Sequence, residues 1–233
     1  MLTDEVLLRP ATVADAPVMA DLHVDSREAN VGSMPPMVHP RETAHRWMQG
    51  RLEGDSTGWV AERHGEAVGY LVLTGYWLDD LFLAPGETGH GIGAALLDVA
   101  KAQRPDGLCL WVFETNEGAR RFYRRHGLLE LERTDGSTNA ERAPDVRMVW
   151  PGPEPLRFLR RLIDDVDDQL GDLLARRAAL TRVVQSHKPD RSRDPEREHQ
   201  IAARLARRAP ELGEDRAARI VHAIISESLD AAE

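Results

Sequence analysis

The stretch LFLAPGETGHGIGA, residues 81–94, decides the fold of the first half of the chain. It predicts the end of a strand, a glycine-rich loop and the start of a helix. Glycines let the backbone approach a ligand closely, and the free N–H groups at a helix N-terminus favour a phosphate group. Taken alone, the stretch also fits a dinucleotide site or a plain turn, so its surroundings must decide.

The surrounding segments alternate between strand-like and helix-like patterns. Strands are predicted at 6–8, 59–62, 67–73, 78–83, 108–113 and 146–150, and helices at 12–24, 92–103 and 117–126. Such an alternation predicts an α/β domain over residues 1–151, with a mixed sheet flanked by helices.

A proline-rich segment, Pro151–Pro155, interrupts this pattern. Residues 152–155 are predicted to be a linker, since prolines stiffen a chain and break regular structure. Residues 156–233 show no strand pattern and predict a separate all-α domain of three helices at 156–187, 195–209 and 215–229.

The composition excludes several classes of protein. The net charge of −9 argues against non-specific nucleic-acid binding, which requires cations that neutralise phosphates. A single cysteine, Cys109, excludes an internal disulfide framework, and no metal-ligand set is predicted. Residues 1–8 carry acids where a signal peptide carries bases, and no apolar run reaches the roughly 18 residues of a membrane span. The sequence therefore predicts a cytoplasmic protein with no nucleic-acid or membrane partner.

A second motif, NEGARRFYRRHGL at residues 116–128, follows the glycine-rich loop after one further strand. Together, in this order and spacing, the two motifs resemble the GNAT superfamily of acyl-CoA N-acyltransferases over roughly residues 5–150. Gly91 and Gly93 match the family's loop, while Thr88 stands where Gln or Arg is usual. The resemblance implies that acetyl-CoA lies in a splay between two strands and donates its acetyl group to an amine.

The resemblance also assigns roles to individual residues. Tyr123 matches the general acid that protonates the departing thiolate. The implied acetyl-CoA contacts are Leu81, Phe82, Leu83, Thr88, Gly89, His90, Gly91, Gly93, Ala94 and Asn116. In this fold the acceptor pocket comes from variable segments, here 28–47 and 134–145, whose shape the sequence does not indicate.

Asp79 and Asp80 are the candidates for the base. As neighbours on a predicted strand they should point to opposite faces, so that only one faces the substrate. Some family members use an acid at the position of Asp79, which is therefore the predicted base. Asp80 and a water relay remain the alternatives.

Arg177 is an unusual residue in the helix predicted at 156–187, because it lies on that helix's apolar stripe. A buried arginine needs a partner, which can be one of the nearby acids or an external anion. Lys188 is eleven residues on, within roughly 20° of the same direction and about 16 Å along the axis. The two cations can therefore close on one dicarboxylate. Arg160 lies about 25 Å from Arg177 on another face, so it could reach that ligand only from a second chain.

These positions, with DPERE at 194–198 and IISES at 224–228, resemble the AroQ family of all-helical type II chorismate mutases over residues 156–232. The family forms an intertwined homodimer that rearranges chorismate to prephenate without a cofactor, a step of the shikimate pathway and of aromatic amino acid biosynthesis. The family's charged cage suits a reaction in which negative charge builds on an ether oxygen. The implied substrate contacts are Arg177 and Arg197, Arg160 of the partner subunit, Lys188 at the ether oxygen, Glu198 at the hydroxyl, and Asp194 and Ser228. Among these, Arg177, Lys188 and Glu198 are the implied catalytic residues.

The sequence thus predicts a bifunctional protein, an acetyl-CoA-dependent N-acetyltransferase fused to a chorismate mutase. One feature keeps an alternative open, because Ala232 stands where the family has a Gln or Glu that contacts the ether oxygen. The alternative is an acetyltransferase whose helical domain is a non-catalytic dimerisation module or a sensor of a chorismate-pathway ligand. A third reading is an isochorismate-pyruvate lyase.

Overall fold

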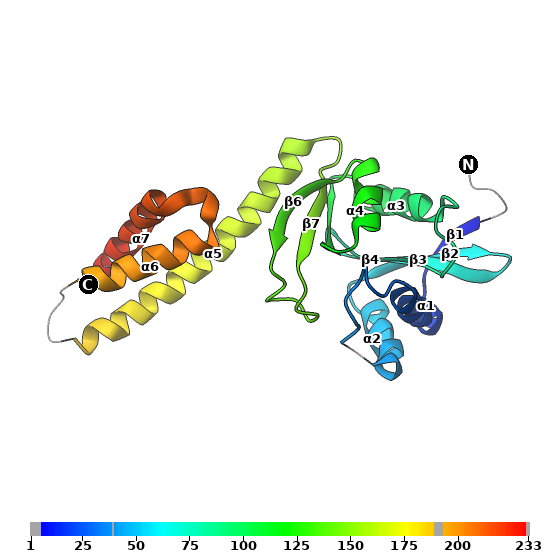
Figure 1. The fold of residues 1–233 in the computed structure, drawn as a ribbon, viewed down its shortest axis with the longest axis horizontal. Helices are drawn as coiled ribbons and strands as arrows, with labels where there is room; N and C mark the ends of the chain where they lie inside the picture. Colours follow the sequence, from blue (N-terminus) through cyan, green and yellow to red (C-terminus); the bar gives the residue numbers. More distant parts are fainter. Residues whose placement is uncertain (1–5, 39, 189–192, 232–233) are drawn as a thin grey trace. The chain divides into compact units, whose positions relative to one another are not determined.

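The computed structural model describes residues 6–38, 40–188 and 193–231 (Figure 1). The chain divides into two compact units between Leu159 and Arg160. Within the described residues, the strands all lie in the first unit and the second unit is helical, which confirms the predicted combination of a mixed sheet with an all-α region.

A seven-stranded sheet forms the first unit, in the order β1-β2-β3-β4-β5-β7-β6. Its strands are β1 (Val6–Pro10), β2 (Thr57–Arg63), β3 (Glu66–Thr74), β4 (Trp77–Leu83), β5 (Leu108–Phe113), β6 (Leu129–Thr134) and β7 (Asp145–Trp150). Every neighbouring pair is antiparallel except β4 and β5, which run parallel. Strand β5 has its predicted bounds, whereas β6 was not predicted.

Helices cover both faces of this sheet. They are the 3₁₀ turn η1 (Val13–Asp15), α1 (Ala16–Ala29), α2 (Arg41–Glu53), α3 (Ile92–Gln103) and α4 (Glu117–Arg125). Successive side chains of β3 point to opposite faces. Tyr70 and Val72 join the core under α1 and α2, and Leu71 and Leu73 join the core under α3 and α4 (Figure 1). Helix α3 has its predicted bounds, but α2 was not predicted.

The parallel strands β4 and β5 separate along their length. Both lie within the described residues, and they pair at a single position, Trp77 with Cys109, although β4 continues to Leu83. The carboxyl-terminal part of β4 therefore leaves its neighbour, and a splay opens between the two strands.

The helical unit consists of α5 (Pro155–Ser186), α6 (Pro195–Arg208), the 3₁₀ turn η2 (Pro210–Leu212) and α7 (Gly213–Asp230). Helix α5 begins at the last residue of the predicted linker, and its first turn belongs to the first unit. There the buried Phe158 ring meets the Tyr76 ring edge-on, with centroids 5.8 Å apart. Gly107 lies beside it with a φ of +140°, and a Cβ on this residue would come within 2.5 Å of Phe158 Cγ.

The apolar stripe of α5 remains on the surface of the single chain. Its spacing alternates between three and four residues, as in a helix that pairs with another helix. The side chains concerned are 47% to 62% exposed: Ile163, Val166, Leu170, Leu173, Leu180 and Val184. Arg177 occupies the position between Leu173 and Leu180 in this repeat. None of the described helices combines the length and apolar character that a membrane crossing needs.

Candidate active sites

The glycine-rich loop joins β4 to α3. Gly89 and Gly91 have φ values of +88° and +83°, a region that favours glycine. Gly91 is the N-cap of α3, and no side chain caps the helix. A Cβ on either glycine would meet nothing within 4 Å, so the loop is open on that side. The first N–H groups of α3 are therefore open to a ligand, and a phosphate bound there stays a prediction.

The remaining predicted cofactor contacts surround this loop. A Cβ on Gly93 would lie 3.6 Å from both Leu83 and Phe122, so α3 packs closely on β4 and α4. Thr88 and His90 are exposed, and Ala94 follows one turn into the helix. These positions fit a pyrophosphate that approaches from solvent.

The three predicted acetyl-CoA contacts on β4 are hydrophobic, and they lie on both faces of the strand. Leu81 and Leu83 pack with the core under α3, while Phe82 packs on the α1 side. The His23 ring meets Phe82 edge-on at 4.6 Å. The splay therefore has an apolar wall on both faces of the sheet.

Tyr123 lies on α4 and is only 8% exposed. Burial raises the pKa of its hydroxyl above the usual value, and the nearby charge of Asp80 raises it further. A phenol with a raised pKa keeps its proton at neutral pH. Asn116 is the N-cap of the same helix, where its Oδ1 accepts a hydrogen bond of 3.1 Å from Ala119 N.

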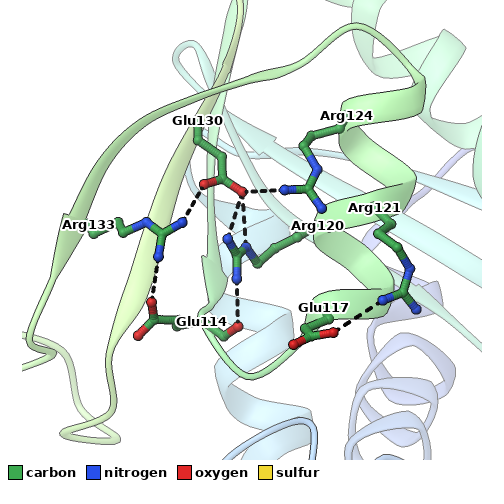
Figure 2. Close-up of polar contacts among 7 residues, drawn as sticks. All are labelled: Glu114, Glu117, Arg120, Arg121, Arg124, Glu130 and Arg133. Atoms are coloured by element: carbon green, nitrogen blue, oxygen red, sulfur yellow. Dashed lines mark hydrogen bonds and ion pairs between the residues drawn. The ribbon is translucent and has the colours of Figure 1, made fainter.

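An arginine cluster on α4, β6 and the end of β5 fixes the helix that carries Tyr123 (Figure 2). Glu130 accepts hydrogen bonds from Arg120 at 2.8 Å, from Arg124 at 3.1 Å and from Arg133 at 2.9 Å. Arg120 also donates to the Glu114 carbonyl at 3.0 Å. The hydrogen bond from Arg120 lowers the pKa of Glu130 most, so this carboxylate stays charged and holds α4 to β6.

The two adjacent aspartates do not point to opposite faces, and this expectation was wrong. Val72 pairs with Asp80 and Leu73 pairs with Leu78, so Asp79 is the extra residue of a β-bulge. One guanidinium therefore reaches both carboxylates: Arg51 donates to Asp80 Oδ2 at 2.6 Å and to Asp79 Oδ2 at 2.5 Å.

The environments of the two aspartates nevertheless differ. Asp79 also accepts a hydrogen bond of 2.5 Å from Thr74, whereas Asp80 is buried, with 6% exposed. Burial raises the pKa of Asp80 to about 6, although the Arg51 charge opposes this change. The charge of Asp80 also raises the pKa of Tyr123, although Tyr123 packs in the core under α3 and α4 and Asp80 contacts residues on the α1 side.

A buried polar cluster surrounds Asp80 on the α1 side. His23 Nδ1 lies 3.0 Å from the Tyr70 hydroxyl and 3.8 Å from Asp80 Oδ1. Burial lowers the pKa of His23 to about 4, and the charges of Arg27 and Arg51 act in the same direction. The imidazole is therefore neutral at pH 7, and Asp80 is the titrating group of the cluster.

Sequence reasoning missed most of this cluster. Arg51 lies on α2, which was not predicted, and His23 and Arg27 are ordinary polar residues of a surface helix in the sequence. Tyr70 lies in a predicted strand but belongs to no motif that indicates a function. Only the fold brings these residues to Asp80.

Arg177 contacts α7 in the helical unit. Its Nη1 donates to Ser228 Oγ at 2.5 Å and to the Ile224 carbonyl at 3.2 Å. The structure thus brings together two of the predicted substrate contacts. Both partners are neutral, so they do not cancel the charge of the half-buried guanidinium.

The predicted contacts on α6 lie at its start. Asp194 caps the helix through a hydrogen bond of 3.0 Å from Arg197 N. Glu198 is held by Arg193, whose Nε and Nη2 donate to its two oxygens at 2.6 Å and 2.7 Å. This ion pair, which the sequence did not indicate, lowers the pKa of Glu198.

The other predicted contacts stay apart within one chain. Arg160 and Lys188 are exposed near opposite ends of α5. The helix extends unbroken from Pro155 to Ser186, so Arg160 lies about 25 Å from Arg177, as expected. Ala232 lies outside the described residues.

Comparisons with known proteins give two matches. A family model for the acetyltransferase (GNAT) domain matches residues 54–127, and a model for chorismate mutase type II matches residues 159–233. The first ends at the close of the NEGARRFYRRHGL motif. The second covers α5 after its first turn and all of α6 and α7.

Curated relatives match the first unit. A peptidyl-lysine N-acetyltransferase YjaB from Salmonella typhimurium is 34% identical over 40% of this chain, and the match spans 64% of that protein, just under two thirds. The peptidyl-lysine N-acetyltransferase YiaC from Escherichia coli is 26% identical over 52% of this chain and 82% of its own length. An uncharacterized N-acetyltransferase from Archaeoglobus fulgidus is 35% identical over 37% of this chain and 68% of its own length.

Solved structures confirm the fold of this unit. The solution structure of apo YjaB from Escherichia coli matches with a TM-score of 0.52 and 23% identity, over 64% of this chain and 99% of that chain. A GCN5-related N-acetyltransferase from Rhodopseudomonas palustris matches with a TM-score of 0.53 and 24% identity, over 65% and 98%.

Proposed function

The chain belongs to the GNAT acetyltransferases and carries a chorismate mutase type II domain after its acetyltransferase domain, and we propose that both domains are catalytically active. The first would transfer an acetyl group from acetyl-CoA to an amine. The second would rearrange chorismate to prephenate.

The observation that carries the first activity is the separation of β4 from β5 next to the open glycine-rich loop. The open loop at Gly89 and Gly91 would bind the pyrophosphate of acetyl-CoA, and Asn116 would contact the cofactor from the start of α4. Tyr123, whose raised pKa keeps it protonated, would give its proton to the thiolate as the C–S bond breaks.

We assign the proton of the amine to Asp80 instead of Asp79. Asp80 is buried, and a pKa of about 6 leaves it ionised at pH 7 and able to accept a proton. Asp79 is engaged by Arg51 and Thr74. The amine nitrogen forms the new C–N bond, loses one proton to Asp80 and becomes the amide.

Thiol release from acetyl-CoA with a panel of amines tests this activity. A Gly91→Glu/Gly93→Glu double variant should lose acetyl-CoA binding, because a carboxylate would occupy the place of the pyrophosphate. Tyr123→Phe should lower kcat about a hundredfold with little change in acetyl-CoA affinity. An unchanged rate in Tyr123→Phe would remove this residue as the acid.

The mutase assignment is supported by the charge of Arg177, which its neutral partners leave available for an anion. Arg177 and Arg197 would bind the substrate carboxylates, Lys188 the ether oxygen and Glu198 the hydroxyl. Asp194 and Ser228 would hold the helix start and the Arg177 side chain. Fixed cations of this kind stabilise the charge that builds on the ether oxygen, so no cofactor takes part.

A second chain would complete this site. The exposed stripe of α5 has the spacing of a helix that packs against another helix, which supports a homodimer through the helical domain. In such a dimer Arg160 of the partner subunit could reach a ligand that Arg160 of the same chain cannot.

Loss of chorismate absorbance on adding the full chain tests the mutase. The competing function is a sensor, favoured by Ala232 at the position of the family's second ether-oxygen contact. A sensor would show no turnover, while chorismate would still raise the melting temperature. Pyruvate release would instead identify a lyase.

A further inference from the structure

A pocket of about 360 Å³ lies at the β5-β7-β6 end of the sheet in the first unit. Three residues of β5 form its floor, and the ends of β6 and β7 and the loop between them form its sides. The lining residues are Trp111, Val112, Phe113, Thr134, Thr138, Asn139, Glu141 and Asp145. Its volume lies in the range of sites for small ligands.

The walls of this pocket carry one negative charge that no cation balances among the described residues. Asp145 is 9% exposed and accepts hydrogen bonds from the Thr134 hydroxyl and from Asn139 Nδ2, both neutral donors. Glu141, by contrast, is paired with Arg27 at 2.9 Å. The pocket therefore favours a cation beside Asp145.

The Trp111 ring also favours a cation in this pocket. Trp111 is 43% exposed and is held in place by a parallel stack on Trp77, with centroids 6.2 Å apart. The face of the other ring, Phe113, already has Arg27 at 5.7 Å. Trp111 thus offers a π-face to a ligand cation within the same pocket as Asp145.

Arg27 connects the pocket with the reaction centre. Its guanidinium binds Glu141 in the pocket wall. Arg27 lies one turn after His23 on α1, and His23 Nδ1 is 3.8 Å from Asp80 Oδ1. Asp80 itself does not line the pocket. A group bound at Asp145 is therefore a neighbour of the reacting amine and not the reacting amine itself.

The charge of a group bound at Asp145 also indicates that this group is not the reacting amine. An ammonium group held by a carboxylate and an aromatic ring keeps its proton and has no lone pair with which to attack a thioester. We propose that the pocket binds a second, protonated amino group of the acceptor, so that the acceptor is a dicationic amine. This inference rests on the proposed acetyltransferase function and names the substrate class of that site. One amine is acetylated as described above, and the second is chemically unchanged.

The test compares linear diamines with monoamines of the same chain length, using the full chain and thiol release from acetyl-CoA. We expect kcat/KM at least tenfold higher for the better diamines. Asp145→Asn should reduce this preference below threefold, mainly through KM, and Trp111→Leu should reduce it partially. Glu132→Gln removes the same charge from the same sheet face outside the pocket and should keep the preference. Equal kcat/KM for both series, or a full preference in Asp145→Asn, would overturn the proposal.

A second arm separates this proposal from the acetyltransferase function. Calorimetry measures binding of 1,4-diaminobutane to the full chain with coenzyme A present, and it needs no turnover. We expect binding that Asp145→Asn weakens about tenfold, and absence of binding would overturn the pocket assignment even if monoamines are acetylated. If diamines bind but no thiol is released, the pocket stands and the proposed activity fails. Peptides with a lysine beside a second lysine or beside alanine show whether the second cation comes from a free diamine or a peptide.

Discussion

The two candidate sites of this chain differ in what a single copy supplies. In the acetyltransferase domain, Asp80 and Tyr123 are buried, and Arg51 and His23 from the same chain surround Asp80. In the helical domain, the partners that the described residues give Arg177 are neutral, and the stripe that contains it is exposed. The comparison teaches that a site made by packing onto a sheet can be complete in one chain. A site made along one exposed helix would need a second helix to cover it.

The largest expected effect comes from charging the stripe of α5. Leu173→Asp/Leu180→Asp places carboxylates where a second copy would bury apolar side chains. We expect a monomer by light scattering and at least about a thousandfold loss of chorismate turnover, with acetyl transfer within twofold of the parent.

Ala175→Asp/Arg182→Asp is the matched control, because both residues are exposed on the opposite face of α5. It should remain dimeric and active as a mutase. If a monomeric Leu173→Asp/Leu180→Asp protein still converts chorismate, the mutase site needs only one chain, as the acetyltransferase site does.

Removing the charge of Arg177 should have the next largest effect. Arg177→Ala deletes a fixed donor to the substrate, and the loss of such a donor costs on the order of 10²–10³ in rate. Chorismate consumption measures the loss, and thiol release by the other domain should not change. The exposed neighbour supplies the control, since Arg176→Ala should keep most of the turnover.

The pH profile of acetyl transfer sharpens the assignment of Asp80. Free amines are protonated below a pKa of about 10, so log kcat/KM should rise with a slope of one as pH increases. Burial raises the pKa of Asp80 to about 6, and the base works only when ionised, so below pH 6 the slope should become two.

Asp80→Asn should lower the rate and retain a slope of one throughout. Asp79→Asn should keep the break near pH 6. A profile of Asp80→Asn that still breaks near pH 6 would assign the proton to another group.

The smallest effect concerns the arginine cluster in Figure 2. Glu130→Gln removes the charge that three arginines share, and we expect a loss of about 1 kcal/mol in the stability of the first domain. This corresponds to a fall in Tm of roughly 3 °C. Glu117 forms an exposed pair with Arg121, and Glu117→Gln should leave Tm within 1 °C. If Tm falls equally in both variants, the cluster stabilises the domain no more than an exposed ion pair does.

The sequence predicted the elements whose pattern is local. The run at 92–103 and the apolar strand at 108–113 were predicted with their bounds. Helix α2 was missed because only Ala44 and Met48 of its residues are buried, which gives no continuous apolar stripe. Strand β6 was missed because it carries charged side chains at the sheet edge, where no alternation is required.

The site was predictable only where a motif carries it. Tyr123 and the loop glycines follow from two motifs, and Arg177 follows from its place on an apolar stripe. The bulge at Asp79 has no signature in the sequence, because it is a property of the pairing between β3 and β4. Arg51 and His23 reach Asp80 from helices distant in sequence, so no local pattern could identify them.

The position of Arg177 within the α5 repeat has a consequence for assembly as well as for binding. A single polar residue among apolar ones makes shifted alignments of two paired helices unfavourable, because a shift would place the charge against an apolar side chain. Helix α5 contains an otherwise uniform repeat, which by itself would tolerate several offsets. If two copies pair through it, Arg177 would favour one offset over the others, at some cost in stability. The residue that would bind the substrate would then also ensure that every assembled pair has the same geometry.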